Sequence, residues 1–431
     1  MEKIIIIGAG PAGLFAANEL ADSCDVTIVD EKNMVGGSGL VSDGKLNFHP
    51  QIGGDLTEFF PEKKPDEAWR LVDYIDQVFG RHGVPDEVYQ EDKLKALETK
   101  AAKVGIKFIP IRQKHIGSDR LPKIMERFKL DLESRGIKFK LSTKATDLQA
   151  KENLLTCVKT DKGDIPCDYV LLAPGRSGSQ WIEEIGDRLH LESDFNPIDV
   201  GIRVEVLAKV MEDVTKINWD PKFHIRTKKY DDFVRTFCVS PYGYVTVENY
   251  GNSLFGVNGH SMRSKRSENT NFAFLVRVGL TEPLENTTEY GRSMVHQANV
   301  LGGGRPLIQR LGDLERGRRS TWSRIERSYV KPTLRDVTPG ELGYAINYRI
   351  VTDIVEGLKI LNSVIPGVYE DHTLLYAPEV KFYAMRVKTN MSLQTKIPNL
   401  FVAGDGAGVS RGIVGAAATG IIAARGILGL R

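Results

Sequence analysis

The sequence predicts an α/β fold in which a parallel sheet flanked by helices is interrupted by a second domain with a mixed or antiparallel sheet. Three observations predict this arrangement. An apolar strand, a glycine turn and a helix follow one another at residues 3–20. A similar strand, turn and helix occur at residues 397–424. From about residue 196, short strand-like runs separated by turn residues predict a different kind of sheet.

The first element is the stretch KIIIIGAGPAGLFAANEL, residues 3–20. Its β-branched run predicts a strand that is covered on both faces, as in a parallel sheet. The glycines that follow are in G-x-G-x-x-G register, which allows a tight turn, close approach of a pyrophosphate and close helix packing. The helix over 11–20 directs its positive end at the phosphates. The expected dinucleotide contacts here are Gly8, Gly10, Pro11, Ala12 and Gly13.

A second strand, DVTIVD, ends at Asp30, which lies 20 residues beyond Gly10. An acid at this separation reaches the ribose hydroxyls of a dinucleotide. We therefore expect Asp30, with Glu31 beside it, to bind the cofactor. NAD and FAD both fit this half-site, whereas a carboxylate would repel the extra phosphate of NADP.

The last strand–turn–helix has the sequence IPNLFVAGDGAGVSRGIVGAAATGIIAA, residues 397–424. It resembles the second fingerprint of FAD enzymes with the glutathione-reductase-type fold. The resemblance implies that Asp405, after Gly404, accepts a hydroxyl of the ribityl chain, and that the helix start at Gly412 or Ile413 faces the flavin pyrimidine ring. A helix N-terminus stabilises the negative charge of a reduced flavin. The two ends of the chain together predict FAD in a Rossmann-like domain of this type.

A third segment, DYVLLAPGRSG at residues 168–178, resembles the A-T-G segment of the same fold, with Pro174 in place of the usual Thr. It implies that Ala173 and Gly175 lie beside the cofactor. The preceding LSTKATDLQA resembles the short strand whose backbone at Ala145 meets the adenine.

The stretches GGSGLVSDGKLNF (36–48), HIGSD (115–119) and LLAPGRSG (171–178), with the C-terminal fingerprint, resemble a broad microbial family. Its members are FAD-dependent dehydrogenases or NAD(P)/FAD-dependent oxidoreductases, most without an assigned substrate. In this family a Glu is usual at the position of Asp405. The resemblance implies further flavin contacts at Gly37, Ser38, Gly39, Asp43, Gly44 and Lys45.

Catalytic residues are not defined by the sequence, and the candidates are Lys45, Glu379 and Arg386. An ammonium at Lys45 would favour an anionic reduced flavin. Glu379 and Arg386 lie in PEVKFYAMRV (378–387), which aligns with a family segment near the flavin, and we expect them to be cleft residues. Ser240 stands where the family often has a second Cys, which disfavours thiol-based catalysis.

The domain organisation predicted from these patterns is discontinuous. The FAD-binding domain is expected at residues 1–195 and 345–431, with a helical insertion at about 50–115. The substrate domain is expected at residues 196–344. No second G-x-G-x-x-G follows a strand, so electrons would come from NAD(P)H in the substrate cleft or from another protein such as ferredoxin.

Composition narrows the class of protein. The 431 residues are 41% hydrophobic and 26% charged, with a net charge of +2, so nucleic acid is not an expected partner. The four cysteines have no zinc-type spacing, and no metal site is predicted. The apolar run over 412–424 is too short to span a bilayer, and we expect a cytoplasmic protein.

The function predicted is an FAD-dependent oxidoreductase that transfers a hydride or electrons between noncovalently bound FAD and a small organic substrate. One alternative is a double-bond reductase supplied by NAD(P)H or ferredoxin. An alternative from another class is an FAD-binding scaffold or RNA-modification partner, favoured by the basic runs at 261–266 and 315–331. The basic segment at 312–331 and His260 could also bind an anion or transfer a proton, although a solvated surface is the simpler reading of both.

Overall fold

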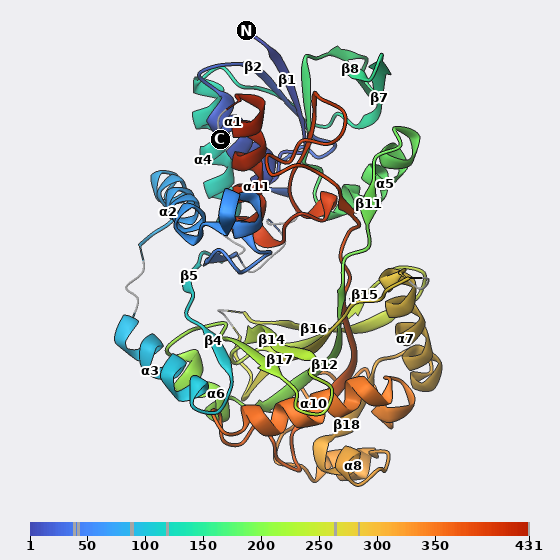
Figure 1. The fold of residues 1–431 in the computed structure, drawn as a ribbon. Coiled ribbons are helices and arrows are strands. Elements are labelled where there is room, and N and C mark those ends of the chain that lie inside the picture. Colours follow the sequence, from blue (N-terminus) through green and yellow to red (C-terminus); the bar gives the residue numbers. More distant parts are fainter. Residues whose placement is uncertain are drawn as a thin grey trace. The chain divides into compact units, whose positions relative to one another are not determined.

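The computed structural model describes residues 1–37, 40, 44–86, 90–117, 120–262, 265–282 and 285–429. The chain forms two compact units, which Figure 1 shows as ribbons. Unit 1 comprises Met1–Val88, Arg112–Asn196 and Tyr383–Arg431. Unit 2 comprises Tyr89–Ile111 and Pro197–Phe382.

Unit 1 is built on a five-stranded parallel sheet, which confirms the expected Rossmann-like α/β architecture. In spatial order its strands are β22 (Leu400–Val402), β10 (Tyr169–Leu172), β1 (Lys3–Ile7), β2 (Asp25–Val29) and β6 (Lys138–Lys140). Its helices are α1 (Pro11–Leu20), α2 (Pro65–Arg81), α4 (Leu121–Ser134), α5 (Ser179–Arg188) and α11 (Gly412–Ile427). Short 3-10 helices are η2 (Leu56–Phe59), η3 (Pro61–Lys63), η4 (Arg176–Gly178) and η6 (Asp405–Ala407).

Over the residues that the structure describes, three small sheets complete unit 1. They are β3 (Lys45–Phe48) with β5 (Arg112–His115), β7 (Ala145–Lys151) with β8 (Leu154–Thr160) and β9 (Ile165–Pro166), and β11 (Ser193–Asp194) with β21 (Arg386–Val387). The central strand β1 is buried from Ile4 to Ile7, as its β-branched sequence predicts for a strand covered on both faces. Helices α1 and α11 lie side by side (Figure 1). They pack so closely that a Cβ on Gly420 would overlap the carbonyl oxygen of Ala12.

Unit 2 is built on an eight-stranded mixed sheet, which confirms the expected second kind of sheet. In spatial order its strands are β19 (Thr338–Pro339), β18 (Leu307–Arg310), β20 (Leu374–Lys381), β12 (Ile198–Leu207), β17 (Asn269–Val278), β14 (Phe233–Ser240), β13 (Lys222–Arg226) and β4 (Lys107–Ile109). A separate hairpin pairs β15 (Tyr244–Asn249) with β16 (Phe255–His260). The helices are α3 (Glu91–Ala102), α6 (Ala208–Thr215), α7 (Thr287–Gly302), α8 (Leu311–Glu315), α9 (Trp322–Glu326) and α10 (Tyr348–Leu361), with the 3-10 helix η5 (Leu342–Tyr344).

The unit boundaries differ from the expected domain boundaries in two places. Residues 345–382, which we assigned to the FAD-binding domain, belong to unit 2, because β20 pairs with β12 and β18 inside its sheet. The expected insertion at 50–115 is divided between the units: α2 lies in unit 1, while α3 and β4 lie in unit 2. Strand β4 is only three residues long and pairs with β13, so local sequence carries almost no signal for it.

The two faces of the unit 2 sheet have different chemistry. Alternate residues such as Phe223, Val234 and Phe274 are buried in one apolar core with residues of α3, α6, α7 and α10. The residues between them include Lys222, Arg235 and Arg203, so the opposite face is polar and charged. Part of this polar face lies against the β15–β16 hairpin, where Val245 and Val257 form a small core with Tyr376.

Candidate cofactor and substrate sites

Three glycine turns meet at the carboxyl edge of the unit 1 sheet, after β1, β10 and β22. A Cβ on Gly8 would overlap the carbonyl oxygen of Ala173, and a Cβ on Gly406 would overlap that of Gly175. Gly8, Gly175 and Gly404 all have positive φ angles, which glycine adopts without strain. The carboxyl edge of an open parallel sheet is the usual ligand position in this architecture. The structure therefore brings the three predicted glycine segments into one place.

The turn after β1 leaves open space beside Gly10 and none beside Gly13. A Cβ on Gly13 would overlap the carbonyl oxygen of Gly8, so this glycine is required for packing. At Gly10, by contrast, no heavy atom lies within 4 Å of the Cβ position, and φ is −82°. Gly10 is the N-cap of α1, and no side chain caps this helix. The free N–H groups of the first turn are available to an anion such as a pyrophosphate.

Asp30 joins the end of β2 to the glycine turn. Its Oδ2 accepts a hydrogen bond from the backbone N–H of Ala9 at 2.7 Å, and its Oδ1 accepts one from Lys32 at 2.8 Å. Burial raises the pKa of this carboxyl, and the two backbone donors oppose that shift. Each carboxylate oxygen keeps a further lone pair, so Asp30 can still accept a ribose hydroxyl. Its backbone carbonyl accepts from Thr143, two residues before Ala145 at the start of β7.

Asp405 begins η6 directly after the turn that follows β22. Its Oδ2 lies 3.3 Å from the backbone nitrogen of Gly412, and 3.5 Å from Nε of Arg176. Its Oδ1 is buried and has no hydrogen-bond partner among the described residues. Burial raises the pKa of this carboxyl, and Arg176 and Gly412 lower it in part. A buried acceptor without a donor is costly, so this oxygen marks the position of a missing hydroxyl or N–H donor.

The start of α11 is a second helix N-terminus at this edge, and Asp405 accepts from its first N–H, that of Gly412. Its N-cap residue Arg411 makes no side-chain cap, and no heavy atom lies within 4 Å of the Cβ position of Gly412. The carboxyl edge of the sheet thus offers N–H donors at the starts of α1 and α11, and one unsatisfied acceptor, Oδ1 of Asp405. This donor set fits FAD, whose phosphates and flavin ring accept hydrogen bonds and whose ribityl hydroxyls donate them.

The sequence reasoning missed the segment at 49–54, which packs on the start of α11. The N–H of Arg411 donates to the carbonyl of Gly53 at 2.7 Å, and a Cβ on Gly53 would overlap the carbonyl oxygen of Arg411. Gly53 and Gly54 both have positive φ. His49, at the start of this segment, is buried and packs edge-on against Trp69. The adjacent pair Gly53-Gly54 was the available sequence signal.

Some of the remaining predicted flavin contacts lie in the described part of the chain, and others lie outside it. Gly37 lies beside the glycine turn, since its Cβ would stand 3.3 Å from the Cα of Gly10. Gly44 packs against the backbone of Gly117, and Lys45 is half-buried at the start of β3, opposite His115. Ser38, Gly39 and Asp43 lie outside the described residues, as do parts of the HIGSD stretch. Glu31 is exposed, and Ile413 is half-buried in the first turn of α11.

The structure argues against Glu379 as a cleft residue, whereas the expectation for Arg386 stays a prediction. Glu379 belongs to unit 2 and its side chain is 0% exposed, so it cannot line an open cleft. Arg386 belongs to unit 1, where it pairs with Glu58 at 2.9 Å. The sequence placed them seven residues apart on one short stretch, but β20 ends at Lys381 and the chain then leaves the sheet.

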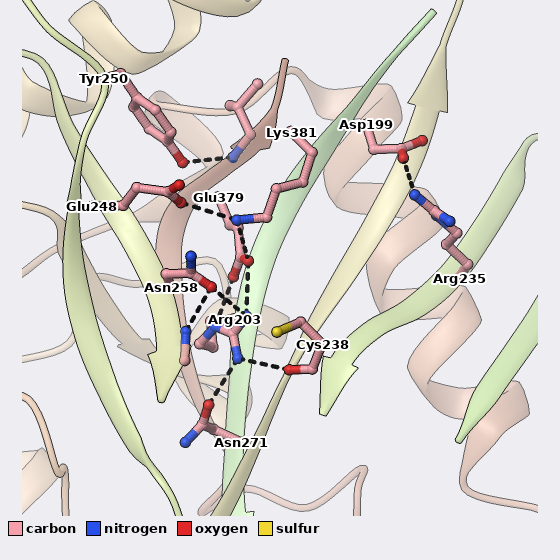
Figure 2. A network of polar contacts seen from close by, with 12 residues as sticks. Asp199, Arg203, Arg235, Cys238, Glu248, Tyr250, Asn258, Asn271, Glu379 and Lys381 are labelled. Carbon is pink, nitrogen blue, oxygen red and sulfur yellow. Dashed lines mark hydrogen bonds and ion pairs between the residues drawn. The ribbon is translucent and has the colours of Figure 1, made fainter. Parts of the chain in front are cut away.

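Glu379 instead holds a buried charged network on the polar face of the unit 2 sheet (Figure 2). It forms a bidentate pair with Arg203, Nε–Oε2 and NH2–Oε1 both at 2.8 Å. Lys381 lies 3.0 Å from Glu379 and 2.9 Å from Glu248. Burial lowers the pKa of Arg203 and Lys381, but the nearby carboxylates of Glu379 and Glu248 contribute to a net rise in both pKa values, so both side chains stay charged. Two cations and two carboxylates balance in this cluster.

The basic segment at 312–331 is largely occupied by local contacts. Arg318 pairs with buried Asp313 at 2.8 Å, Arg316 pairs with Asp371 at 2.9 Å, and Arg324 donates to the carbonyl of Arg319 at 2.8 Å. His260 is an exposed residue at the end of β16. These contacts favour a structural role for the segment over an anion-binding rim. Cys24, Cys157, Cys167 and Cys238 are all free thiols.

Over the described residues, no helix combines the length and the apolar character needed to cross a membrane. In the same part of the chain, no three His, Cys, Asp or Glu side chains converge in the way that a metal ion requires.

Three protein-family models match the chain. Residues 197–382 match "FAD-dependent protein, C-terminal domain-like", and this range coincides with the larger segment of unit 2. Residues 6–42 match an NAD(P)-binding Rossmann-like domain, and residues 341–429 match glucose inhibited division protein A. The fold and these domains define the class: the chain is an FAD-dependent protein with a Rossmann-like nucleotide-binding domain, and FAD is its cofactor.

Individual relatives are distant. A Clostridium beijerinckii protein described as "Uncharacterized protein" is 25% identical over 460 residues, which cover 98% of this chain and 80% of that protein. The solved structure of L-proline dehydrogenase from P. horikoshii is 12% identical, covers 100% of this chain and 94% of that chain, and has a TM-score of 0.44. The structure of 3-ketosteroid-Δ4-(5α)-dehydrogenase from Rhodococcus jostii RHA1 is 12% identical and has a TM-score of 0.47. The match covers 98% of this chain and 96% of that chain. Scores below 0.5 carry no conclusion about the substrate.

Proposed function

We propose that the protein holds FAD noncovalently at the carboxyl edge of the unit 1 sheet and uses it to transfer a hydride or electrons to or from a small organic substrate. The observation that carries this proposal is the buried, unpartnered Oδ1 of Asp405, whose other oxygen accepts from the first N–H of α11. An acceptor and a set of N–H donors at the same edge match a ligand with both hydroxyls and anionic groups.

In this proposal each end of the chain binds one half of the cofactor. The first turn of α1 and Gly10 bind the pyrophosphate, and Asp30 accepts a ribose hydroxyl. Asp405 accepts a ribityl hydroxyl, and the first N–H groups of α11 stabilise negative charge on the flavin ring. Lys45 is a candidate for the same electrostatic role. Bound FAD supplies the redox chemistry, while the protein orients it and excludes water.

Binding is tested by Asp405→Ala, measured as FAD affinity by fluorescence titration of the stripped protein. Loss of a hydrogen bond to a charged acceptor costs about 1.5–3 kcal/mol, or about tenfold to a hundredfold in Kd. The control variant is Asp336→Ala, an exposed carboxylate of unit 2 that pairs with Arg305. If both variants bind FAD as tightly as the natural protein, Asp405 does not hold the cofactor.

Electron transfer is tested by anaerobic bleaching of the bound flavin. NADH, NADPH and reduced ferredoxin are compared as reductants, and a panel of small metabolites is screened as direct donors. Denaturation followed by filtration should release the flavin into the filtrate, because the binding is noncovalent. A purified protein that carries no flavin and does not bind added FAD would contradict the proposal.

A further inference from the structure

A cavity of about 230 Å³ lies in unit 1, where the end of α2 meets α4. It is lined by Arg81 and His82 at the end of α2, and by Arg127 and Asp131 of α4. The two helices are in contact here, since the imidazole of His82 stacks on the ring of Phe128 with centroids 4.2 Å apart. This imidazole is buried, whereas the other three lining residues are exposed. The cavity therefore has one packed wall and charged side chains that a solute can reach.

The cavity is separate from the glycine turns that we assign to the cofactor. Arg135, one turn after Asp131 on α4, donates to the side chain of Asn18 at 2.9 Å and to its backbone carbonyl at 3.0 Å. Asn18 lies in the last turn of α1, whereas Gly10 precedes the first turn of this helix. Because Asp131 also lies 4.0 Å from Arg135, the cavity is beside the end of α1 that points away from the glycine turn.

Two arginines of the cavity have no carboxylate partner. Among the described residues, neither Arg81 nor Arg127 forms an ion pair, although Asp131 follows Arg127 by one turn of α4. The guanidinium of Arg127 instead lies over Gly83, where a Cβ would stand 2.5 Å from its NH1 atom. Two like charges that line one cavity repel each other, and a bound anion would turn this repulsion into attraction.

The carboxylate of Asp131 is available to accept a hydrogen bond. Nδ1 of His82 lies 2.7 Å from the carbonyl oxygen of Val78, which can only accept, so Nδ1 carries a proton. Nε2 of the same ring lies 3.6 Å from Oδ2 of Asp131, which is too long for a hydrogen bond. Arg135 is further away, at 4.0 Å. Within the described part of the chain, Asp131 thus has long ion pairs and lone pairs that no donor occupies.

We propose that this cavity binds an oxyanion that still carries a proton, hydrogenphosphate. The guanidiniums of Arg81 and Arg127 donate to its unprotonated oxygens, and Asp131 accepts from its P–OH group. A phosphate has enough oxygens to meet two guanidiniums and still present a hydroxyl, whereas a carboxylate ligand has only two oxygens. A fully deprotonated anion such as sulfate has no proton to offer, and the charge of Asp131 repels it.

The test is calorimetric titration of the purified protein with inorganic phosphate, sulfate and acetate near neutral pH. Excess FAD is present so that its own phosphates occupy the cofactor site, and the ionic strength is held constant because salt screens exposed charges. We expect phosphate to bind more tightly than sulfate, and acetate to bind most weakly. Absence of phosphate binding would overturn the site, and equal affinity for phosphate and sulfate would overturn the role of the proton.

The position of the site is tested with Arg127→Gln, which should weaken phosphate binding about tenfold, as loss of one charged contact predicts. Arg127→Lys keeps the charge and should recover part of the affinity. The matched control is Arg70→Gln, because Arg70 is an exposed arginine of α2 that pairs with Glu67 at 3.2 Å. Equal weakening by Arg127→Gln and Arg70→Gln would show that phosphate binds elsewhere.

The role of Asp131 is tested with Asp131→Asn, measured by the same titrations. The amide loses the negative charge and can donate a hydrogen bond, so sulfate should bind more tightly and phosphate less tightly than in the natural protein. The preference for phosphate over sulfate should therefore decrease. An unchanged preference would contradict the contact with the P–OH group.

This site does not depend on the proposed function. Phosphate binding by a protein that carries no flavin would contradict the proposed function and leave the phosphate site standing. Flavin binding without phosphate binding would do the reverse.

Discussion

The two sheets of this protein use their faces in opposite ways. In unit 1 the central strand β1 is apolar on both faces, and the candidate contacts Gly10 and Asp405 lie on a turn or helix end at the carboxyl edge of the five-stranded sheet. In unit 2 one face is apolar and the other carries Arg203, Arg235 and Glu379. The comparison teaches that unit 1 offers mainly backbone groups to a ligand, whereas unit 2 offers side chains from the sheet itself.

The largest effect is expected from breaking the buried ion pair of unit 2 with Arg203→Met. The variant leaves Glu379 buried with less compensation, and removal of one partner of such a pair costs about 3–5 kcal/mol. Chemical denaturation measures this loss in the free energy of unfolding. The double variant Arg203→Met with Glu379→Met should recover part of the loss. If the single variant is as stable as the natural protein, the polar face tolerates an uncompensated charge.

The next effect concerns the backbone of unit 1. Gly13→Ala places a methyl group on the carbonyl oxygen of Gly8 and should cost about 1–3 kcal/mol, as overpacking does in other cores. Gly10→Ala is the matched control, because its Cβ meets open space at an ordinary φ. It should leave the free energy of unfolding of the FAD-free protein within about 1 kcal/mol, as a surface change does. Its effect should be weaker FAD binding, measured by fluorescence titration.

The two glycine variants therefore distinguish packing from binding. A large loss of stability in FAD-free Gly10→Ala would mean that the space beside Gly10 is needed for folding. Unchanged FAD affinity in Gly10→Ala would mean that the pyrophosphate does not approach this residue.

The smallest effect is a pH dependence of stability in unit 2. Burial raises the pKa of Asp353 from 3.8 to about 6, and the neighbouring Asp232 adds to this shift. The hydroxyl of Thr227 donates a hydrogen bond to Asp353 at 2.7 Å. Nε of Arg349 donates to Asp232 at 2.6 Å and lowers the pKa of that carboxyl. Because folded Asp353 binds its proton more tightly than the unfolded chain does, its contribution to stability is lost as pH rises from about 4 to about 6.

Asp353→Asn removes this titration. The Tm of the variant minus that of the natural protein should therefore increase between pH about 4 and about 6, measured by calorimetry. Asp336→Asn, at an exposed position, should show a flat difference over the same range. A flat difference for Asp353→Asn as well would show that this carboxyl titrates normally.

Local sequence was sufficient for the strand–turn–helix units of the cofactor-binding half, although it missed the segment at 49–54. The register of Gly8, Gly10 and Gly13, the distance to Asp30 and the Gly-Asp turn at 405 predict strands and helices at the positions where they occur. This succeeds because each turn imposes a backbone requirement that only particular residues meet, and such requirements are visible within a few residues.

Only the tertiary structure decided where unit 2 ends and what its charged residues do. Strand β20 joins the sheet through β12, and Glu379 lies 176 residues after Arg203, so no local pattern predicts that the two pair. His224 of β13 likewise pairs with Lys107 of β4, a strand that lies far earlier in the chain. The sequence determined the class of cofactor, because backbone turns are encoded locally. Pairing between distant strands determined the charged face, because a side chain's field depends on neighbours that the chain brings together only on folding.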